Sequence, residues 1–292
     1  MWLGAAHSVP NTALRRGHYL LEVSNLTKRY GSTVAVDGLD LVTHPGEILA
    51  LLGPNGAGKT TTIRCATGQA RPTSGSIKIA GFDVATQPLE AKSATGFVPD
   101  RAWFYPKVTA RELLRYVAGI RRQPAADQRI GELLERFRLS RYADALIESY
   151  SHGMRQRLAF CAALLGEPRL FVSDEPMVGL DVQGHREVKK LFRELAAAGK
   201  TVILTTHTLA VAEEIADRIA VMDHGRLIAL GTMAELRAAT AQADSVSLED
   251  LFLLLTEAEQ AEASPLEGPN SGTSGTSGTS SATSAAHRRR RP

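Results

Sequence analysis

The chain has 292 residues, of which 43% are hydrophobic and 22% are charged, as expected for a soluble protein with a sizeable core. The net charge of +3 becomes −1 without the four arginines at 288–291, which argues against a basic nucleic-acid-binding protein. The apolar run at 251–255 is far shorter than the roughly 20 residues that span a bilayer. The two cysteines, Cys65 and Cys161, fall in predicted helices and indicate buried free thiols rather than a disulfide framework.

The first 18 residues show no hydrophobic periodicity, which predicts a flexible lead-in at 1–18. The next stretches, 19–31 and 32–47, alternate apolar and polar residues around a turn at Gly31, as two antiparallel strands do. Tyr30, at the end of the first strand, has two possible roles. It either stacks on a purine ring or is a half-buried tyrosine at a strand end.

The stretch at 53–60, GPNGAGKT, fits the phosphate-binding pattern G-x-x-x-x-G-K-[ST] at every fixed position. An apolar strand, 47–52, precedes the loop, and a helix that Gly68 could stop follows it. Glycines let backbone N–H groups approach phosphate oxygens, and the following helix directs its partial positive charge at the same anion. Lys59 would neutralise the outer phosphates and the Thr60 hydroxyl would hold Mg²⁺.

In the middle of the chain the predicted secondary structure changes from strands to helices. A short hairpin is predicted at 74–84 and a strand at 94–100. Apolar residues then recur at helical spacing in 109–122, where Thr109 is a plausible cap, and in 129–139. These patterns predict a mostly helical lobe, about 100–165, inserted into an α/β core.

The core resumes at 169–176 with a short strand that ends in two carboxylates, Asp174 and Glu175. A helix at 183–198, a strand at 201–206, His207, another helix and a hairpin at 218–230 follow. Strands that alternate with helices predict a mainly parallel sheet, and ligands of such sheets gather at the carboxyl ends of the strands. The predicted fold class is α/β: a P-loop NTPase core with an antiparallel N-terminal β subdomain and an inserted α-helical subdomain.

From about residue 259 the sequence is rich in Gly, Ser and Thr and poor in large apolar groups. Such a segment cannot bury enough surface to offset its ordering entropy, so 259–292 is predicted to be a disordered tail with a basic end.

With these motifs in view, residues 20–256 resemble the ATP-binding subunit of ABC transporters. The most specific element is YSHGMRQR at 150–157, which corresponds to the diagnostic LSGGQ segment and the basic-Gln-basic helix that follows it. Ser151 is a good helix N-cap and Gly153 permits close backbone approach, which together make a second anion-binding helix start. His152 and Met154 depart from the usual pattern, in a way similar to exporters whose six-span permease is a separate subunit.

The resemblance implies a nucleotide site divided between two chains. Asp174 would hold Mg²⁺ through water, Glu175 would orient or deprotonate the attacking water, and His207 would bond the γ-phosphate or Glu175. Asp100 stands where the family usually has glutamine and is a further candidate metal ligand. The residues expected to bind the nucleotide are Tyr30, Gly53, Pro54, Asn55, Gly56, Ala57, Gly58, Lys59, Thr60, Thr61, Ser151 and Gly153.

The expected cofactors are ATP and Mg²⁺, and the expected partners are a transmembrane permease and a second ATPase subunit, identical or related, bound head to tail. No specific nucleic-acid partner is expected. The ATPase domain is predicted at 19–258, in the cytoplasm on the inner face of the membrane. One alternative is another P-loop NTPase, although no Asn-Lys-x-Asp element for guanine occurs. The other is a soluble ATPase of the same superfamily that acts on ribosomes or DNA.

Overall fold

The computed structural model describes residues 19–123, 125–239 and 247–254. The predicted lead-in and tail lie outside these ranges. The strands are β1 (Leu21–Tyr30), β2 (Thr33–Thr43), β3 (Ile48–Leu52), β4 (Ser74–Ile79), β5 (Phe82–Asp83), β6 (Thr95–Val98), β7 (Leu170–Asp174), β8 (Thr201–Thr205), β9 (Arg218–Asp223) and β10 (Arg226–Gly231). The α-helices are α1 (Lys59–Ala66), α2 (Pro88–Ser93), α3 (Ala110–Ile120), α4 (Ala126–Arg136), α5 (His152–Leu164), α6 (Val182–Ala197), α7 (Leu209–Ile215) and α8 (Met233–Ala239); Ser140–Tyr142 and Ile147–Ser149 are short 3-10 helices.

A six-stranded sheet with the order β10-β9-β3-β8-β7-β6 forms the centre of the molecule. Strands β9, β3, β8, β7 and β6 run parallel, and only β10 is antiparallel to its neighbour. All five residues of β3, β7 and β8 are buried. Strands covered on both faces are expected to be apolar throughout, which explains why the sequence shows runs here rather than alternation. The predicted mainly parallel sheet is confirmed.

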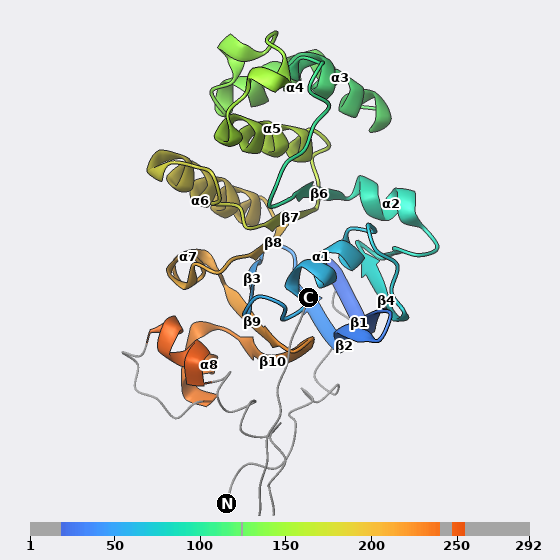
Figure 1. Cartoon of the computed structure of the whole chain (residues 1–292), viewed down its shortest axis with the longest axis vertical. Coiled ribbons are helices and arrows are strands. Elements are labelled where there is room, and N and C mark those ends of the chain that lie inside the picture. Colours follow the sequence, from blue (N-terminus) through green and yellow to red (C-terminus); the bar gives the residue numbers. More distant parts are fainter. Residues whose placement is uncertain (1–18, 124, 240–246, 255–292) are drawn as a thin grey trace, which may run out of the picture.

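The two faces of this sheet belong to two hydrophobic cores. One face, which includes Ala50 and Phe171, packs with α5, α6 and the other helices above it in Figure 1. The opposite face, which includes Leu49 and Val172, packs with α1 and the antiparallel strands. Those strands form a second sheet in the order β2-β1-β4-β5 and confirm the predicted N-terminal β subdomain.

Helices α3, α4 and α5 gather at one end of the molecule, the top of Figure 1. Thr109 caps α3 as predicted: its side chain accepts from the Glu112 N–H, and the Glu112 carboxylate accepts from the Thr109 N–H. Stacked rings join this lobe to the sheet, because Phe160 of α5 lies 5.6 Å from Phe137 and 6.1 Å from Phe171, measured between ring centroids. The inserted helical subdomain is therefore packed directly on the sheet.

Two features lie outside the sequence-based expectations. Helix α2 has only six residues and begins at Pro88, and α8 follows the last hairpin directly. The stretch at 247–258 resembles the short helix that ends many exporter-type subunits, and residues 248–254 are helical, as far as the structure describes that stretch. Within the described ranges, no helix combines the length and the hydrophobicity needed to cross a bilayer. Both cysteines are free and buried, as expected.

Candidate functional site

The glycine-rich loop connects β3 to α1, as predicted, and its backbone needs glycine at two positions. Gly53 has φ of +154° and Gly58 has φ of +101°, both in the region that favours glycine. A Cβ atom on Gly58 would lie 2.5 Å from the Ala35 carbonyl oxygen, and one on Gly53 would overlap the Met222 carbonyl. Neighbouring backbone therefore encloses the loop too closely for any larger residue.

Two other segments hold this loop in place. The Gly225 N–H, in the turn between β9 and β10, donates to the Ala57 carbonyl at 3.1 Å. The Asp37 N–H of β2 donates in turn to the Gly225 carbonyl at 2.9 Å. The loop is thus fixed by both sheets before any ligand binds, and fixed backbone dipoles need little reorganisation when a charged ligand arrives.

Lys59, the first residue of α1, folds back over the loop. Its ammonium donates to the carbonyl oxygens of Gly53 at 2.6 Å and Pro54 at 3.0 Å, and the residue is only 9% exposed. Burial lowers the pKa of Lys59 below its ordinary value, while the nearby carboxylates of Glu175 and Asp174 oppose that shift. Because neutral carbonyl oxygens accept the hydrogen bonds of this buried ammonium, it is ready to exchange them for phosphate oxygens.

The N-terminus of α1 is left open toward the loop. Gly58 occupies the N-cap position, where no side chain caps the first turn. Thr60 is exposed and Thr61 is half-buried, while Pro54, Asn55 and Gly56 of the loop are exposed. The free N–H groups and partial positive charge of α1 therefore face a loop that solvent can reach.

The two acidic residues at the end of β7 are held by a single threonine of β8. The Thr205 hydroxyl donates to Asp174 Oδ1 at 2.5 Å. The Glu175 N–H donates to the Thr205 hydroxyl at 3.1 Å and to its carbonyl at 3.2 Å. Glu175 has φ of +50°, a conformation that non-glycine residues adopt at a cost and that concentrates at functional sites. The sequence did not mark Thr205, because a buried threonine is common in any strand.

His207 follows β8 and faces the acidic pair. Its Nδ1 lies 2.9 Å from Glu175 Oε2, and its side chain is 69% exposed whereas that of Glu175 is 19% exposed. Sheet order explains the contact, because β8 lies between β3 and β7 and brings His207 between the loop and Glu175. The structure thus brings together the predicted residues Lys59, Asp174, Glu175 and His207.

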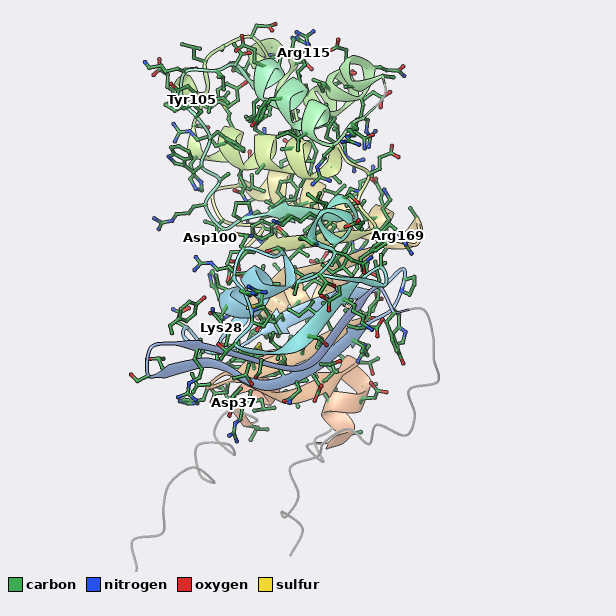
Figure 2. The ribbon with its side chains drawn as sticks, turned by 90° about the vertical axis from the view of Figure 1, so that its right-hand side faces the viewer. Lys28, Asp37, Asp100, Tyr105, Arg115 and Arg169 are labelled. Carbon is green, nitrogen blue, oxygen red and sulfur yellow. The ribbon has the colours of Figure 1, made fainter. Side chains whose placement is uncertain are left out.

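Asp100 lies at the same edge of the sheet, after β6, which pairs with β7 in parallel. Figure 2 shows this edge at its left, where Asp100 is labelled, whereas Arg169, at the amino end of β7, lies on the opposite side. Asp100 is partly buried and follows the neighbouring strand, in a position compatible with the predicted metal contact.

Tyr30 lies at the end of β1 and is 48% exposed, so one part of its ring is open to solvent. The Lys28 ammonium lies 4.8 Å from the ring centroid and also donates to the Arg71 carbonyl at 2.8 Å. A cation held against the ring leaves the exposed part available for stacking. The geometry is compatible with both roles considered for Tyr30.

Ser151 and Gly153 lie elsewhere, at the start of α5 in the helical subdomain. The Ser151 hydroxyl accepts from the Met154 N–H at 3.3 Å and caps the helix, as predicted. A Cβ on Gly153 would lie 2.8 Å from the Gly179 carbonyl, and the His152 ring covers the face of Gly179. Among the described residues, no hydrogen bond or ion pair joins this helix start to the loop at 53–60. Within one chain, the start of α5 and the glycine-rich loop are therefore not bonded to each other.

A parallel α/β sheet that sets a Gly-x-x-x-x-Gly-Lys-Thr loop beside an acidic pair at a strand end defines a P-loop nucleoside triphosphatase. The family model described as ABC transporter matches residues 36–178. Nod factor export ATP-binding protein I of Ralstonia nicotianae is 39% identical over 253 residues, which cover 84% of this chain and 79% of that protein. The chain therefore belongs to the ABC transporter ATP-binding family, and it is an ATPase.

Solved structures agree with this assignment. The structure of an ATP-binding subunit of an ABC transporter has a TM-score of 0.78 and 33% identity, with 81% of this chain and 99% of that chain covered. A dimeric post-hydrolysis ATP-binding cassette bound to ADP and Pi has a TM-score of 0.67 and 25% identity, with 73% and 98% covered. The predicted fold class and family are confirmed.

Proposed function

We propose that this chain supplies the energy for a membrane exporter by closing head to tail with a second ATPase subunit, identical or related, around two ATP molecules. A separate transmembrane permease would carry the cargo and hold the ATPase on the inner face of the membrane. The observation that carries this proposal is the separation of the loop at 53–60 from the start of α5, which no hydrogen bond or ion pair joins among the described residues.

Within one chain, the sheet edge would bind the triphosphate. The N–H groups of residues 53–61 and the Lys59 ammonium would hold the phosphates, and the exposed part of Tyr30 would stack on the base. Thr60, Asp174 and Asp100 offer oxygen atoms, the ligands that Mg²⁺ prefers. Asp174 Oδ1 is already engaged by Thr205, which leaves Oδ2 to face the ion or its water. Bound Mg²⁺ would neutralise charge on the phosphates.

Glu175 and His207 would act on water and on the γ-phosphate. Glu175 is tied through its N–H to β8 and lies against His207, so its carboxylate is directed by two neighbours. In that position it would orient the attacking water and accept its proton, a role typically worth about 10²–10⁴-fold in rate. His207, whose side chain is mostly exposed, would then bond the γ-phosphate once the nucleotide is in place.

The second subunit would contribute the start of α5. Ser151 is exposed at the N-terminus of this helix, and Gly153 lies in its first turn, where the Gly179 carbonyl of the same chain packs against it. Both residues would contact the phosphates held by the opposite loop. The dimeric cassette with ADP and Pi supports pairing of such domains. The proposed ATPase domain spans 19–258, with the helical subdomain at about 100–165.

Two exposed aromatic side chains support the proposal that this chain binds a permease. Trp103 is 82% exposed and Tyr105 is 59% exposed, and both follow Asp100 directly along the chain. Figure 2 shows Tyr105 on the same side of the molecule as Asp100. Large apolar groups exposed in this way mark interaction sites in soluble domains. We propose that this segment contacts the permease, and the export role named for the Ralstonia relative supports an exporter.

Replacement of the catalytic carboxylate tests the ATPase cycle. Glu175→Gln should retain ATP binding, lose turnover by at least about 10²-fold, and accumulate ATP-bound dimers, because the amide cannot accept a proton from water. Size-exclusion chromatography with multi-angle light scattering would detect the dimer and phosphate release would report turnover. Lys59→Ala, which should bind no fluorescent ATP analogue, is the matched control. Near-normal hydrolysis by the Glu175→Gln protein would remove this residue from catalysis.

A pulldown from detergent-solubilised membranes tests the partner. The full chain should co-purify with a polytopic membrane protein, and Trp103→Ala with Tyr105→Ala should weaken that association while ATP binding is preserved. The matched control is Tyr116→Ala, an exposed aromatic residue on α3 outside this segment. Recovery of ribosomes or DNA in place of a membrane protein would overturn the transport function.

A further inference from the structure

Gln156 is a buried polar residue of α5 that the proposed mechanism does not use. It lies five residues after the N-cap Ser151 and is only 1% exposed. Its Nε2 donates to the Pro99 carbonyl at 3.4 Å, and its buried Oε1 has no hydrogen-bond partner. A side-chain amide therefore connects α5 to the segment that carries Asp100, while its Oε1 accepts no hydrogen bond from any residue that the structure describes.

The segment at 99–101 holds the complementary groups. In the part of the chain that the structure describes, the N–H groups of Asp100 and Arg101 make no hydrogen bond. They follow directly after the carbonyl that Gln156 already contacts. A side-chain amide can pair with a backbone C=O and a nearby N–H at once, and a buried acceptor without a partner is unfavourable. Donor and acceptor are thus both unpaired on two elements that already touch.

We propose that Gln156 is the positioning residue for Asp100: in the nucleotide-bound state its Nε2 keeps the bond to the Pro99 carbonyl while its Oε1 accepts from the Arg101 N–H, which fixes this segment on α5. This inference rests on the proposed role of Asp100 at the metal. The two hydrogen bonds would hold the segment on α5 and keep the Asp100 carboxylate in one orientation toward the ion. Groups that orient metal ligands in this way typically contribute about 10–100-fold to metal affinity.

The same contact has a consequence for a dimer. Helix α5 begins at Ser151, which the proposed function places against the nucleotide of the opposite subunit. Binding of Mg²⁺ at one site would therefore affect, through Gln156, the position of α5, the helix that contacts the other nucleotide.

The test uses the full chain in the Glu175→Gln background, where hydrolysis does not interfere. Gln156→Met keeps the length and removes both polar atoms. We expect the Mg²⁺ concentration for half-maximal binding of a fluorescent ATP analogue to rise about 10-fold. Hydrogen exchange should show protection of the amides at 100–101 on addition of Mg²⁺ and nucleotide in the parent, and no such protection in the variant.

Two controls separate this role from a structural one. Thr109→Ala removes the cap of α3, so it should lower stability while leaving the Mg²⁺ requirement and the protection of 100–101 unchanged. In an Asp100→Ala background, Gln156→Met should cause no further change in the Mg²⁺ requirement. If Gln156→Met does not fold, Gln156→Asn, which keeps the amide but shortens its reach, takes its place.

The inference is overturned if a folded Gln156 variant keeps the Mg²⁺ requirement within twofold of the parent and retains protection at 100–101. Failure of the proposed function would be visible separately, because the Glu175→Gln parent would then bind ATP without forming the ATP-bound dimer in light scattering.

Discussion

At the scale of single residues, Thr205 has the most unexpected position. One hydroxyl serves Asp174 as donor and Glu175 as acceptor, and the residue is fully buried in the central part of the sheet. The Asp174 carboxylate and the Glu175 backbone are therefore held by the same buried side chain. Groups of this kind set the orientation of the residues that do the chemistry.

Thr205→Val removes the hydroxyl and keeps the shape of the side chain, so it measures what the hydroxyl contributes to stability and turnover. Asp174 Oδ1 would lose its donor inside the protein, which is expected to cost about 1–3 kcal/mol in the free energy of unfolding. Turnover should fall about 10–100-fold through misplacement of Asp174. Thr205→Ser, which keeps the hydroxyl and loses one methyl group, is the control. Equal turnover in the valine variant and the parent would contradict this assignment.

Residues with a fixed chemical pattern were the ones that the sequence predicted well. The glycines at 53 and 58 and Lys59 follow from the spacing of one motif, and the structure shows the close backbone contacts that require them. Thr205 and Gln156 could not be found in this way. Their roles depend on hydrogen bonds to segments 30 and 57 residues away in the sequence, which no local pattern encodes.

At the scale of elements, the start of α5 depends on a buried phenol. Tyr150 is 3% exposed and its hydroxyl donates to the Tyr142 carbonyl at 2.7 Å. Burial, together with the nearby Cys161 and Asp144, raises the pKa of Tyr150 from 10.0 to about 12. The neutral phenol therefore stabilises the segment that leads into Ser151.

This shift predicts a loss of stability at high pH. Between pH 10 and about 12, Tyr150 is ionised in the unfolded chain but still neutral in the folded one. Its contribution is thus complete below pH 10 and is lost as pH rises through about 12. Urea unfolding from pH 9 to 12 should show a steeper decline for the parent than for Tyr150→Phe, which has no ionisable group there. Identical slopes for the two proteins would contradict the prediction.

Elements with strong local signals were predicted closely, and weaker ones were missed. The α3 helix has an apolar face and a capping box, and both are visible in the sequence. Helix α2 is short and α8 packs against β10, so tertiary contacts rather than local periodicity determine them. For the same reason the sequence predicted a mainly parallel sheet but not the order of its strands.

At the scale of the whole molecule, the helical subdomain shares its hydrophobic core with the sheet. The cluster that includes Leu133 and Phe160 continues without a break to Phe171 and Phe192, which belong to β7 and α6. The insertion is therefore a separate lobe in outline, while its packing is joined to that of the sheet (Figure 1). A lobe joined in this way has no independent core to sustain it.

We accordingly expect the sheet and the lobe to unfold in one cooperative transition. Leu133→Ala, in α4, should lower the free energy of unfolding by about 2–5 kcal/mol. Hydrogen exchange should report that loss equally at buried amides of α5 and of β8, because both belong to one unit. A variant in which only the amides of the lobe exchange faster would show that the lobe unfolds by itself.

Strand β8 has a further consequence for how the molecule is made. It lies between β3 and β7 and hydrogen-bonds to both, yet the ribosome produces it after both. A nascent chain that has emerged only as far as residue 200 contains the glycine-rich loop and both carboxylates. It lacks the strand that lies between them, so we expect that it cannot hold them in place. Insertion of β8 completes the ATPase site. We therefore expect a growing polypeptide to hydrolyse no ATP until most of it has left the ribosomal exit tunnel.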